Sequence, residues 1–454
     1  MQLPSELIRS LKNAPGFDEE KFLAVHQTRE TITSVRFNPS KMASALVDCR
    51  AEKVPWSSNG FYLQSRPFFT FDPFLHAGVY YVQEASSMFL EQAIRQTISL
   101  NESIKVLDLC AAPGGKSTLV QSLLNEYSLL VSNEVIKARV NVLAENMTKW
   151  GYSNQVITNN DAKDFQRLPG YFDLVIVDAP CSGSGLFRRD PTAMEEWSPS
   201  NVELCGQRQQ RILADVLPAL KENGILIYST CSFSVEEDEA IADWLIEHQE
   251  MESVPLALDP SWNIVESPSQ TGARGYRFYP DKLKGEGFFL ACFRKTAEEP
   301  SKIPKGIKLT LPNRNELEIA GSMIDDPTKL FFWKLTDRVL TIPIQFHEDI
   351  KLIIASMYIR KAGICIGKIA GKDLVPDHEL AMSQIAAPGI PSITLKNEIA
   401  LQYLRREEVK IETGLKGWVL AQYEGVSLGW MKVLANRVNN YYPREWRILK
   451  GSGN

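Results

Sequence analysis

Residues 104–120 read IKVLDLCAAPGGKSTLV, an apolar run that breaks at a Pro-Gly-Gly turn and resumes with helix-forming residues. A short run of Ile, Val and Leu is typical of a strand buried on both faces, and Pro113 and Gly114 end it. The stretch therefore predicts a parallel strand, a tight loop and the start of a helix. In an open α/β sheet such a loop holds a ligand, because small residues let the ligand approach the backbone.

The loop differs from the common phosphate-binding motifs. It matches neither G-x-G-x-x-G nor G-x-x-x-x-G-K-[ST], and it has too few glycines to wrap a triphosphate. We therefore expect a cofactor that is not held by its phosphates, with an ordinary strand-to-helix turn as the alternative.

Strand and helix patterns alternate after residue 104, which predicts βαβ units and a parallel sheet. Strands are expected at residues 105–109, 129–133, 155–158, 172–177 and 224–229, with helices near 116–126, 135–149, 201–221 and 235–249. The strand at 287–294 follows an extended stretch instead of a helix, so it could pair antiparallel at the end of the sheet.

At 454 residues the chain exceeds what one hydrophobic core usually supports. A polar, Pro-bearing stretch at residues 296–305 predicts a linker. We expect a small α+β lead-in over 1–75, the α/β sheet domain over 76–296, a small intermediate domain over 306–375 and a C-terminal domain over 376–454.

Composition excludes several classes of protein. No apolar run reaches the roughly 18 residues of a membrane span, and the N-terminus lacks a signal-peptide core, which favours a cytoplasmic protein without a membrane partner. The seven cysteines are scattered, without a C-x-x-C pair, and there is no H-E-x-x-H motif, so we expect reduced thiols and no metal site.

Charge is distributed unevenly along the chain. Residues 1–300 hold 28 Lys and Arg against 39 Asp and Glu, whereas residues 301–454 hold 22 against 16. A basic tail region on an acidic body suggests a contact with phosphates, as in nucleic-acid-binding proteins, and a merely solvated surface is the alternative.

Acidic residues stand at the ends of three of the expected strands: Glu134, Asp161 and Asp178. A carboxylate after the second strand can accept hydrogen bonds from a ribose diol, and the later ones can face a base. These positions favour S-adenosylmethionine, although a nicotinamide cofactor remains possible. Lys116 either caps a ligand carboxylate or substrate, or is a solvated lysine of the first helical turn.

Cys181 and Cys231 follow the fourth and fifth expected strands, so both lie on the ligand edge of the sheet. Two thiols suit the methylation of a pyrimidine at C5. One thiolate adds to C6 and makes C5 nucleophilic, the second thiol assists elimination, and a carboxyl such as Asp178 stabilises protonation at N3. The alternative for any single cysteine is that its side chain is a small buried hydrophobe. We interpret the side chains of Cys110, Cys205 and Cys292 in this way.

Three long segments stand in a specific order along the chain: DLCAAPGGKST, DAPCSGSGLFRRDP and YSTCSFSVEEDE. They resemble the Nop/Sun family of RNA cytosine-C5 methyltransferases, and within it the bacterial 16S ribosomal RNA enzymes of the RsmF kind. The resemblance spans nearly the whole chain, and GWVLAQYEGVSLGWMK with NNYYPREWR is similar, more loosely, to the PUA-like RNA-binding tail of that family.

The resemblance implies a Rossmann-like class I methyltransferase sheet, S-adenosylmethionine as cofactor, Cys231 as nucleophile and Cys181 as the group that releases product. Asp178 and Lys116 complete the expected catalytic set. DNA cytosine methyltransferases instead attack from the cysteine of the P-C motif. The cofactor contacts implied by the family are Cys110, Ala111, Ala112, Pro113, Gly114, Gly115, Lys116, Glu134, Asp161 and Asp178.

A target base in folded RNA must be unstacked, at a cost of roughly a few kcal/mol, so phosphate and stacking contacts must hold the rest of the RNA. The arginines expected to bind RNA are Arg188 and Arg189 near the base, and Arg437, Arg444 and Arg447 in the tail. The tail aromatics expected to help are Tyr441, Tyr442 and Trp446.

These observations predict a monomeric enzyme that methylates C5 of cytosine in 16S ribosomal RNA or in the small ribosomal subunit. Three rivals remain: the same chemistry on transfer RNA, a DNA enzyme that attacks from Cys181, and a non-catalytic RNA-binding factor of ribosome assembly. The presence of both thiols and Asp178 argues against the last.

Overall fold

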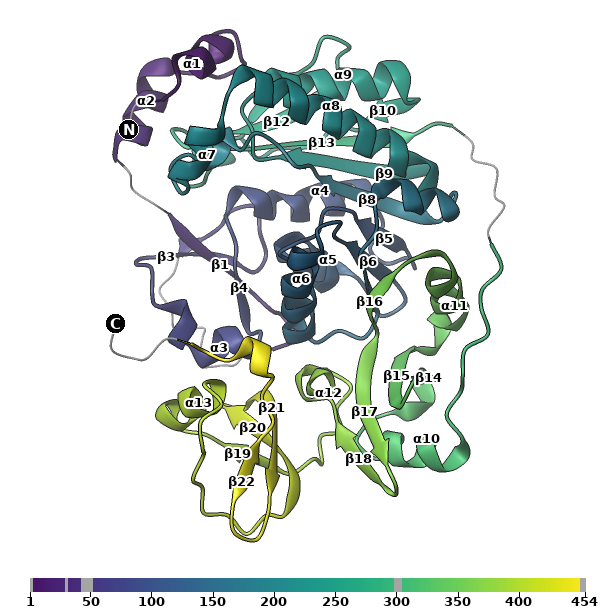
Figure 1. Ribbon diagram of the computed structural model, residues 1–454. Coiled ribbons are helices and arrows are strands. Elements are labelled where there is room, and N and C mark those ends of the chain that lie inside the picture. The colour runs from purple at the N-terminus through teal and green to yellow at the C-terminus, as the bar shows by residue number, and fades with distance from the viewer. Residues whose placement is uncertain (1–2, 29–31, 42–51, 298–303, 450–454) are drawn as a thin grey trace.

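A central ten-stranded sheet organises the protein in the computed structural model, which describes residues 3–28, 32–41, 52–297 and 304–449 (Figure 1). The strand order is β11-β12-β13-β9-β8-β5-β6-β7-β16, with β10 paired to β13. The strands of this sheet are β5 Lys105–Asp108, β6 Leu129–Asn133, β7 Gln155–Thr158, β8 Phe172–Asp178, β9 Leu220–Thr230, β10 Met251–Ser253, β11 Val265–Pro268, β12 Arg274–Phe278, β13 Phe288–Lys295 and β16 Ile359–Ala362.

The five strands expected from the alternating pattern form the parallel part of this sheet. β5 pairs with both β6 and β8, β6 pairs with β7, and β8 pairs with β9, all in parallel. The expected antiparallel addition is also confirmed, since β13 lies against β9. The α/β fold class that the sequence predicts is therefore correct.

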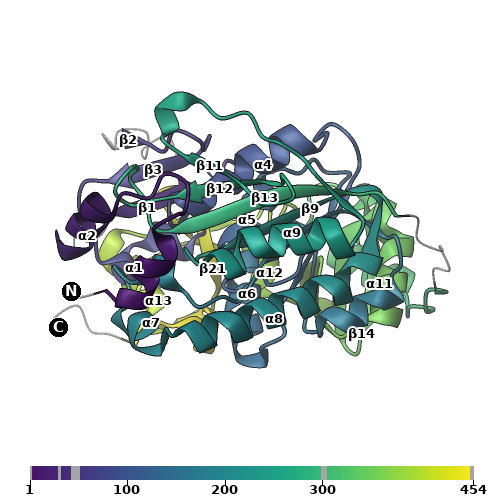
Figure 2. The same cartoon turned by 90° about the horizontal axis from the view of Figure 1, so that it is seen from above.

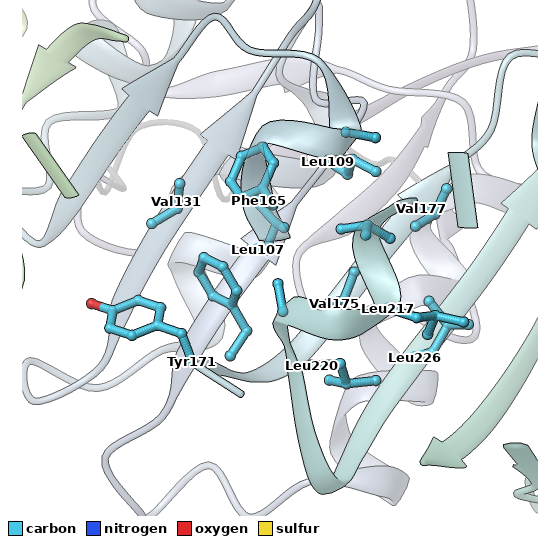
Figure 3. Close-up of a cluster of buried hydrophobic side chains, with 14 of the residues drawn as sticks. Leu107, Leu109, Val131, Phe165, Tyr171, Val175, Val177, Leu217, Leu220 and Leu226 are labelled. Atoms are coloured by element: carbon cyan, nitrogen blue, oxygen red, sulfur yellow. The ribbon is translucent and has the colours of Figure 1, made fainter. Parts of the chain in front are cut away.

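Helices cover both faces of the sheet (Figure 2). Alternate residues of each strand point to opposite faces, so neighbours such as Val106 and Leu107 belong to different cores. Figure 3 shows the core that contains Leu107, Val175 and Phe165. One face packs on α4 Leu90–Thr97, α5 Gly115–Leu123 and α6 Lys137–Trp150, and the other on α8 Pro199–Val216, α9 Glu239–His248 and α11 His347–Ser356.

The helix expected over 201–221 is shorter than predicted at its C-terminal end. α8 ends at Val216, a 3-10 turn follows over Leu217–Ala219, and β9 already begins at Leu220. Pro218 lies in that turn and has no N–H to continue an α-helix, so the apolar residues that follow it join the sheet.

The segment expected to form an intermediate domain shares the core of the central sheet. β16 pairs antiparallel with β7, and Ile350 and Ile353 of α11 pack in the same core as Leu107 and Val175. Its remaining strands make a second sheet, in the order β14-β15-β17-β18. The elements of this segment besides β16 and α11 are α10 Arg314–Gly321, β14 Leu330–Leu335, β15 Arg338–Pro343, β17 Ile364–Ala370 and β18 Asp373–Pro376.

The lead-in and the tail pack against each other. Val35 and Tyr80 of the N-terminal sheet share a core with Tyr403 and Met431 of the tail, and β4 extends the N-terminal sheet beyond residue 75. The remaining elements are α1 Ser5–Leu11, α2 Glu19–Thr28, β1 Thr33–Phe37, β2 Glu52–Lys53, β3 Gly60–Leu63, α3 Pro73–His76, β4 Tyr80–Val82, α7 Pro191–Glu196, α12 His378–Met382, β19 Ser392–Thr394, α13 Asn397–Leu404, β20 Gly417–Tyr423, β21 Val426–Val433 and β22 Val438–Asn440.

Among the helices of the described residues, none is both long enough and apolar enough to span a membrane.

The shared core predicts that α11 stabilises the central sheet. Ile353→Ala removes a fully buried side chain from it and should lower the free energy of unfolding by about 2 to 5 kcal/mol, measured by urea denaturation followed by circular dichroism. Leu335→Ala, at a side chain that is 62% exposed, is the matched control and should change it by less than about 0.5 kcal/mol. An Ile353→Ala curve that coincides with the wild type would contradict a shared core.

Candidate active site

A pocket of about 450 Å³ opens at the carboxyl edge of the parallel strands. Its wall contains side chains from the loops that follow β5, β6, β7, β8 and β9, and from α8. The residues that line it are Leu109, Cys110, Ala112, Asn133, Glu134, Val135, Ile136, Arg139, Asn160, Asp161, Ala162, Asp178, Ala179, Pro180, Cys181, Gly183, Leu186, Arg208, Arg211, Ile212 and Cys231. The pocket therefore brings together the two cysteines and the three strand-end acids that the sequence singled out.

The two cysteine sulfurs are neighbours although 50 residues separate them in the chain. The Sγ atoms of Cys181 and Cys231 are 3.0 Å apart, and the Gly185 amide donates a hydrogen bond to the Cys231 carbonyl at 2.8 Å. The hydrogen bond with Cys231 and burial raise the pKa of the Cys181 thiol well above its usual value. Cys181 therefore keeps its proton near neutral pH and can act as the donor in the contact between the sulfurs.

Asp178 lies at the end of β8 and is held by two neighbours. Its carboxylate accepts a hydrogen bond from the Ser229 hydroxyl at 2.8 Å and forms an ion pair with Lys116 Nζ at 2.8 Å. Burial alone would lower the pKa of Lys116, but the Asp178 carboxylate raises it, so the lysine stays charged. Lys116 is not among the residues of the pocket wall, and its ion pair holds the Asp178 carboxylate that is.

Glu134 and Asp161 follow the next two strands. The Glu134 side chain is only 3% exposed, lies 3.4 Å from Arg139, and accepts a hydrogen bond from the Ile136 amide. Its Oε2, the atom 3.4 Å from the Arg139 guanidinium, is buried and makes no hydrogen bond with any described residue. The Asp161 carboxylate accepts a hydrogen bond from the Lys163 amide and remains exposed in the pocket wall.

The glycine loop contributes less of the wall than expected. Cys110 and Ala112 line the pocket, whereas the other expected cofactor contacts of the loop do not: these are Ala111, Pro113, Gly114, Gly115 and Lys116. Gly114 has a φ of 114°, a backbone conformation that favours glycine, and the chain enters α5 directly after it. Behind the loop, burial raises the pKa of Asp108 to about 7 while Ser117 Oγ donates to its carboxylate at 2.6 Å.

The expected RNA contacts are spread over several surfaces. Arg189, Arg437, Arg444 and Arg447 are exposed. Arg188 is the exception: its side chain is 2% exposed and its guanidinium lies 3.8 Å from the buried Glu286 carboxylate, so the prediction that it contacts RNA phosphates disagrees with its burial.

The tail aromatics also differ in their surroundings. Tyr442 is 1% exposed and packs in the core shared by the lead-in and the tail, so it is not available for stacking. Tyr441 is 39% exposed and lies edge-on to Trp418, and Trp446 is partly buried beside Lys149.

Sequence reasoning missed two features of the site. Arg208 and Arg211 lie three residues apart on the exposed face of α8 and line the pocket, and no hydrogen bond or ion pair joins either guanidinium to another described residue. A separation of three residues places two side chains on the same face of a helix, so the sequence could have indicated this pair of arginines. The second feature is the buried carboxylate of Glu237, which accepts hydrogen bonds from both cysteine loops and which only the tertiary structure reveals.

Within the described part of the chain, no group of three or more His, Cys, Asp or Glu side chains is arranged to hold a metal ion.

Three protein-family models match consecutive parts of the chain. The N-terminal domain of 16S rRNA methyltransferase RsmF matches residues 3–85, 16S rRNA methyltransferase RsmB/F matches residues 95–294, and the methyltransferase RsmF PUA domain matches residues 391–448. Together these models account for the lead-in, the central sheet and the tail.

Curated relatives resemble the chain over most of its length. Ribosomal RNA small subunit methyltransferase F of Aliivibrio fischeri is 31% identical over 415 residues, which cover 87% of this chain and 85% of that protein. The protein of the same name from Psychromonas ingrahamii is 30% identical over 458 residues, covering 94% of this chain and 93% of its own.

Solved structures share the fold of the sheet. A methyltransferase homolog protein from Pyrococcus horikoshii superimposes with a TM-score of 0.51 at 27% identity, over 64% of this chain and 100% of its own. NSun6 from Pyrococcus horikoshii, solved with SFG, gives a TM-score of 0.53 at 19% identity, over 65% of this chain and 99% of its own, and at that identity it shows the fold alone.

The close contact between the cysteine loops predicts that Gly185 tolerates no side chain. A Cβ atom there would lie 2.5 Å from the Gly287 carbonyl oxygen and 2.7 Å from that of Cys231. Gly185→Ala should therefore lower the free energy of unfolding by about 1 to 3 kcal/mol in urea denaturation. Gly389→Ala, at a position with open space around it, is the control, and equal stability of the two variants would refute the tight packing of the loops.

Proposed function

The chain belongs to the RsmF family of 16S ribosomal RNA methyltransferases, and on that premise we propose that it transfers a methyl group from S-adenosylmethionine to C5 of a cytosine in 16S ribosomal RNA. The observation that supports this chemistry best is the 3.0 Å separation of the Cys181 and Cys231 sulfurs in the wall of a pocket that also contains Asp178. A pyrimidine held against that wall meets a nucleophile, a second thiol and a carboxylate at once.

The residues of the pocket suit S-adenosylmethionine, whose role is to supply an electrophilic methyl group. The Glu134 carboxylate lines the pocket beside Arg139, where we assign it to the ribose diol, and Asp161 is exposed where it can accept from an amino group of the base. Ile136 gives an apolar surface beside them. We therefore assign the cofactor to this part of the pocket, with Cys110 and Ala112 at the loop.

The cytosine occupies the other part of the pocket, beside the two sulfurs. The Cys231 thiolate forms a bond to C6, and the electron pair of the C5–C6 double bond moves to C5. C5 would then take the methyl group of bound S-adenosylmethionine, as the bond from that methyl group to the sulfonium sulfur breaks and the donor leaves as the thioether S-adenosylhomocysteine. Loss of the C5 proton to a base restores the double bond and expels the Cys231 sulfur. Cys181 assists this elimination, and Asp178 accepts a hydrogen bond from the protonated N3 while Lys116 holds the carboxylate in place.

This assignment predicts different fates for the two cysteine variants with RNA that contains 5-fluorocytosine, because a C5 fluorine cannot leave as a proton does. Cys231→Ala should form no covalent RNA adduct and should lose methyl transfer by about a thousandfold or more. Cys181→Ala should still form this trapped adduct, and with ordinary cytosine RNA, which the wild type releases, it should keep the covalent adduct, as seen by denaturing gel electrophoresis.

Cys205→Ala, a buried cysteine of α8 outside the pocket wall, is the control for removing a thiol. An adduct that survives Cys231→Ala and disappears in Cys181→Ala would exchange the two roles, as in enzymes that attack from the P-C cysteine.

Arg208 and Arg211 line the pocket without partners among the described residues, and we propose that they bind phosphates next to the flipped cytosine. The exposed Arg189 and the tail arginines are proposed to contact RNA further from the base. The tail thereby docks the substrate while the sheet performs the chemistry.

Replacing both Arg208 and Arg211 with alanine should raise the KM for RNA about tenfold. The slope of the logarithm of the RNA-binding constant against the logarithm of the salt concentration should become shallower by about one for each phosphate that is no longer bound. The kcat should change much less. Arg314→Ala, on the exposed start of α10, is the matched control. Equal salt slopes for the double variant and the wild type, measured by filter binding, would rule out these phosphate contacts.

The substrate is tested by bisulfite sequencing of ribosomal and transfer RNA from a deletion strain. Loss of one 5-methylcytosine from 16S ribosomal RNA is expected, whereas loss from transfer RNA would make that RNA the substrate. Loss of no methyl group, together with defective subunit assembly, would favour a non-catalytic factor. A ribosomal substrate also places the enzyme in the cytoplasm, and we propose a monomer because one chain supplies every wall of the pocket.

A further inference from the structure

Glu237 lies behind the two cysteines and connects the loops that bear them. Its Oε1 accepts hydrogen bonds from the Ser182 amide at 2.8 Å and from Gln209 Nε2 at 3.2 Å. Its Oε2 accepts from the hydroxyls of Ser182 at 2.5 Å and Ser232 at 2.6 Å. Since Ser182 follows Cys181 and Ser232 follows Cys231, a single carboxylate binds the residue next to each sulfur.

The position of Glu237 separates it from the ligands. The side chain is fully buried and is absent from the pocket wall, so it reaches neither a cofactor nor a base. Burial raises its pKa, while the hydrogen bonds from Ser182 and Ser232 oppose that rise. Burying a carboxylate is costly unless its oxygens are well bonded, and here four donors satisfy them.

We propose that Glu237 is a positioning residue that sets the separation of the Cys181 and Cys231 sulfurs. The inference rests on the proposed function, because it explains how two thiols on separate loops stay close enough to share one cytosine. Gln209 anchors the carboxylate to α8, so the loops are held relative to the helix that covers the sheet as well as to each other.

Removing the carboxylate leaves the Ser182 amide and both hydroxyls without their acceptor. A buried unsatisfied donor is unfavourable, so the loops are expected to shift until these groups find water or another partner. A displacement of about 1 Å at reacting groups reduces rates by about a hundredfold, even when the altered residue is remote from the chemistry. Two of the hydrogen bonds that remain between the loops run from the Gly185 amide to the Cys231 carbonyl and from the Phe233 amide to the Ser184 hydroxyl, and neither connects Ser182 with Ser232 as the carboxylate does.

The first experiment measures the sulfur separation without using activity. Phenylarsine oxide bridges two adjacent thiols through two As–S bonds and releases one water, and intact-protein mass spectrometry detects the bridged product. The wild type should be bridged, and Cys181→Ser, which lacks one thiol, should not. Glu237→Ala should slow bridging at least about tenfold, and Glu236→Ala, at the exposed neighbouring glutamate, should react as the wild type does.

The second experiment measures methyl transfer to RNA by the same variants. Glu237→Ala should lower kcat about a hundredfold with the KM for S-adenosylmethionine nearly unchanged, because Glu237 lies outside the pocket. Glu237→Gln keeps the shape and one acceptor oxygen, and its amide can donate to the Ser232 hydroxyl. It should therefore restore bridging and most of kcat.

Ser232→Ala removes one of the four hydrogen bonds to the carboxylate, together with the acceptor of the Ser234 amide, and guards against misfolding of Glu237→Ala. If Glu237→Ala unfolds, a tenfold slower bridging of folded Ser232→Ala still supports the proposal, and bridging at the wild-type rate overturns it. For a folded Glu237→Ala, wild-type bridging and kcat overturn it as well. Methyl transfer that persists in both cysteine variants would reject the proposed chemistry, yet the bridging rates would still report whether Glu237 sets the sulfur separation.

Discussion

The parallel pairing of β8 with β9 determines where Cys181 and Cys231 lie. In this register Asp178 is opposite Ser229, and the Ala179 amide donates to the Ser229 carbonyl at 2.8 Å. Each strand then ends within a few residues of its cysteine, and the loops that follow the two strands leave the sheet at the same edge. The hydrogen-bond ladder of two neighbouring strands thereby brings Cys181 and Cys231 together, and the loops need only hold what the ladder has already aligned.

Polar side chains beneath and between the loops do that holding. Asp108 binds Ser117 beneath the glycine loop, Lys116 pairs with Asp178, and Glu237 binds the loops of both cysteines. Such groups have strict geometric requirements, because water does not supply a new partner when a hydrogen bond inside the protein is lost. Their contribution is orientation of the reacting groups more than stability.

The N-terminal lead-in takes part in the same support. The buried Arg36 of β1 donates to the Thr118 hydroxyl at 2.6 Å and to the Gly115 carbonyl at 3.2 Å, and its guanidinium lies 4.7 Å from the centre of the Trp150 ring. It thus connects the N-terminal sheet to the first turn of α5. Since that sheet also shares a core with the tail, the tail and the glycine loop belong to one connected framework.

Local elements and the grouping of the strand-end acids and cysteines at one edge of the sheet could be predicted from the sequence alone. The run at 104–120, the alternation of strands and helices, and the acids and cysteines at strand ends follow from periodicity and turn chemistry, which act over a few residues. Contacts between distant segments had to come from the folded chain. Packing alone established that β16 joins the central sheet, that Arg188 is buried beside Glu286, and that Glu237 lies between the cysteine loops. The physical reason is that burial and hydrogen-bond partners of a side chain depend on segments far away in sequence, on which local patterns have no bearing.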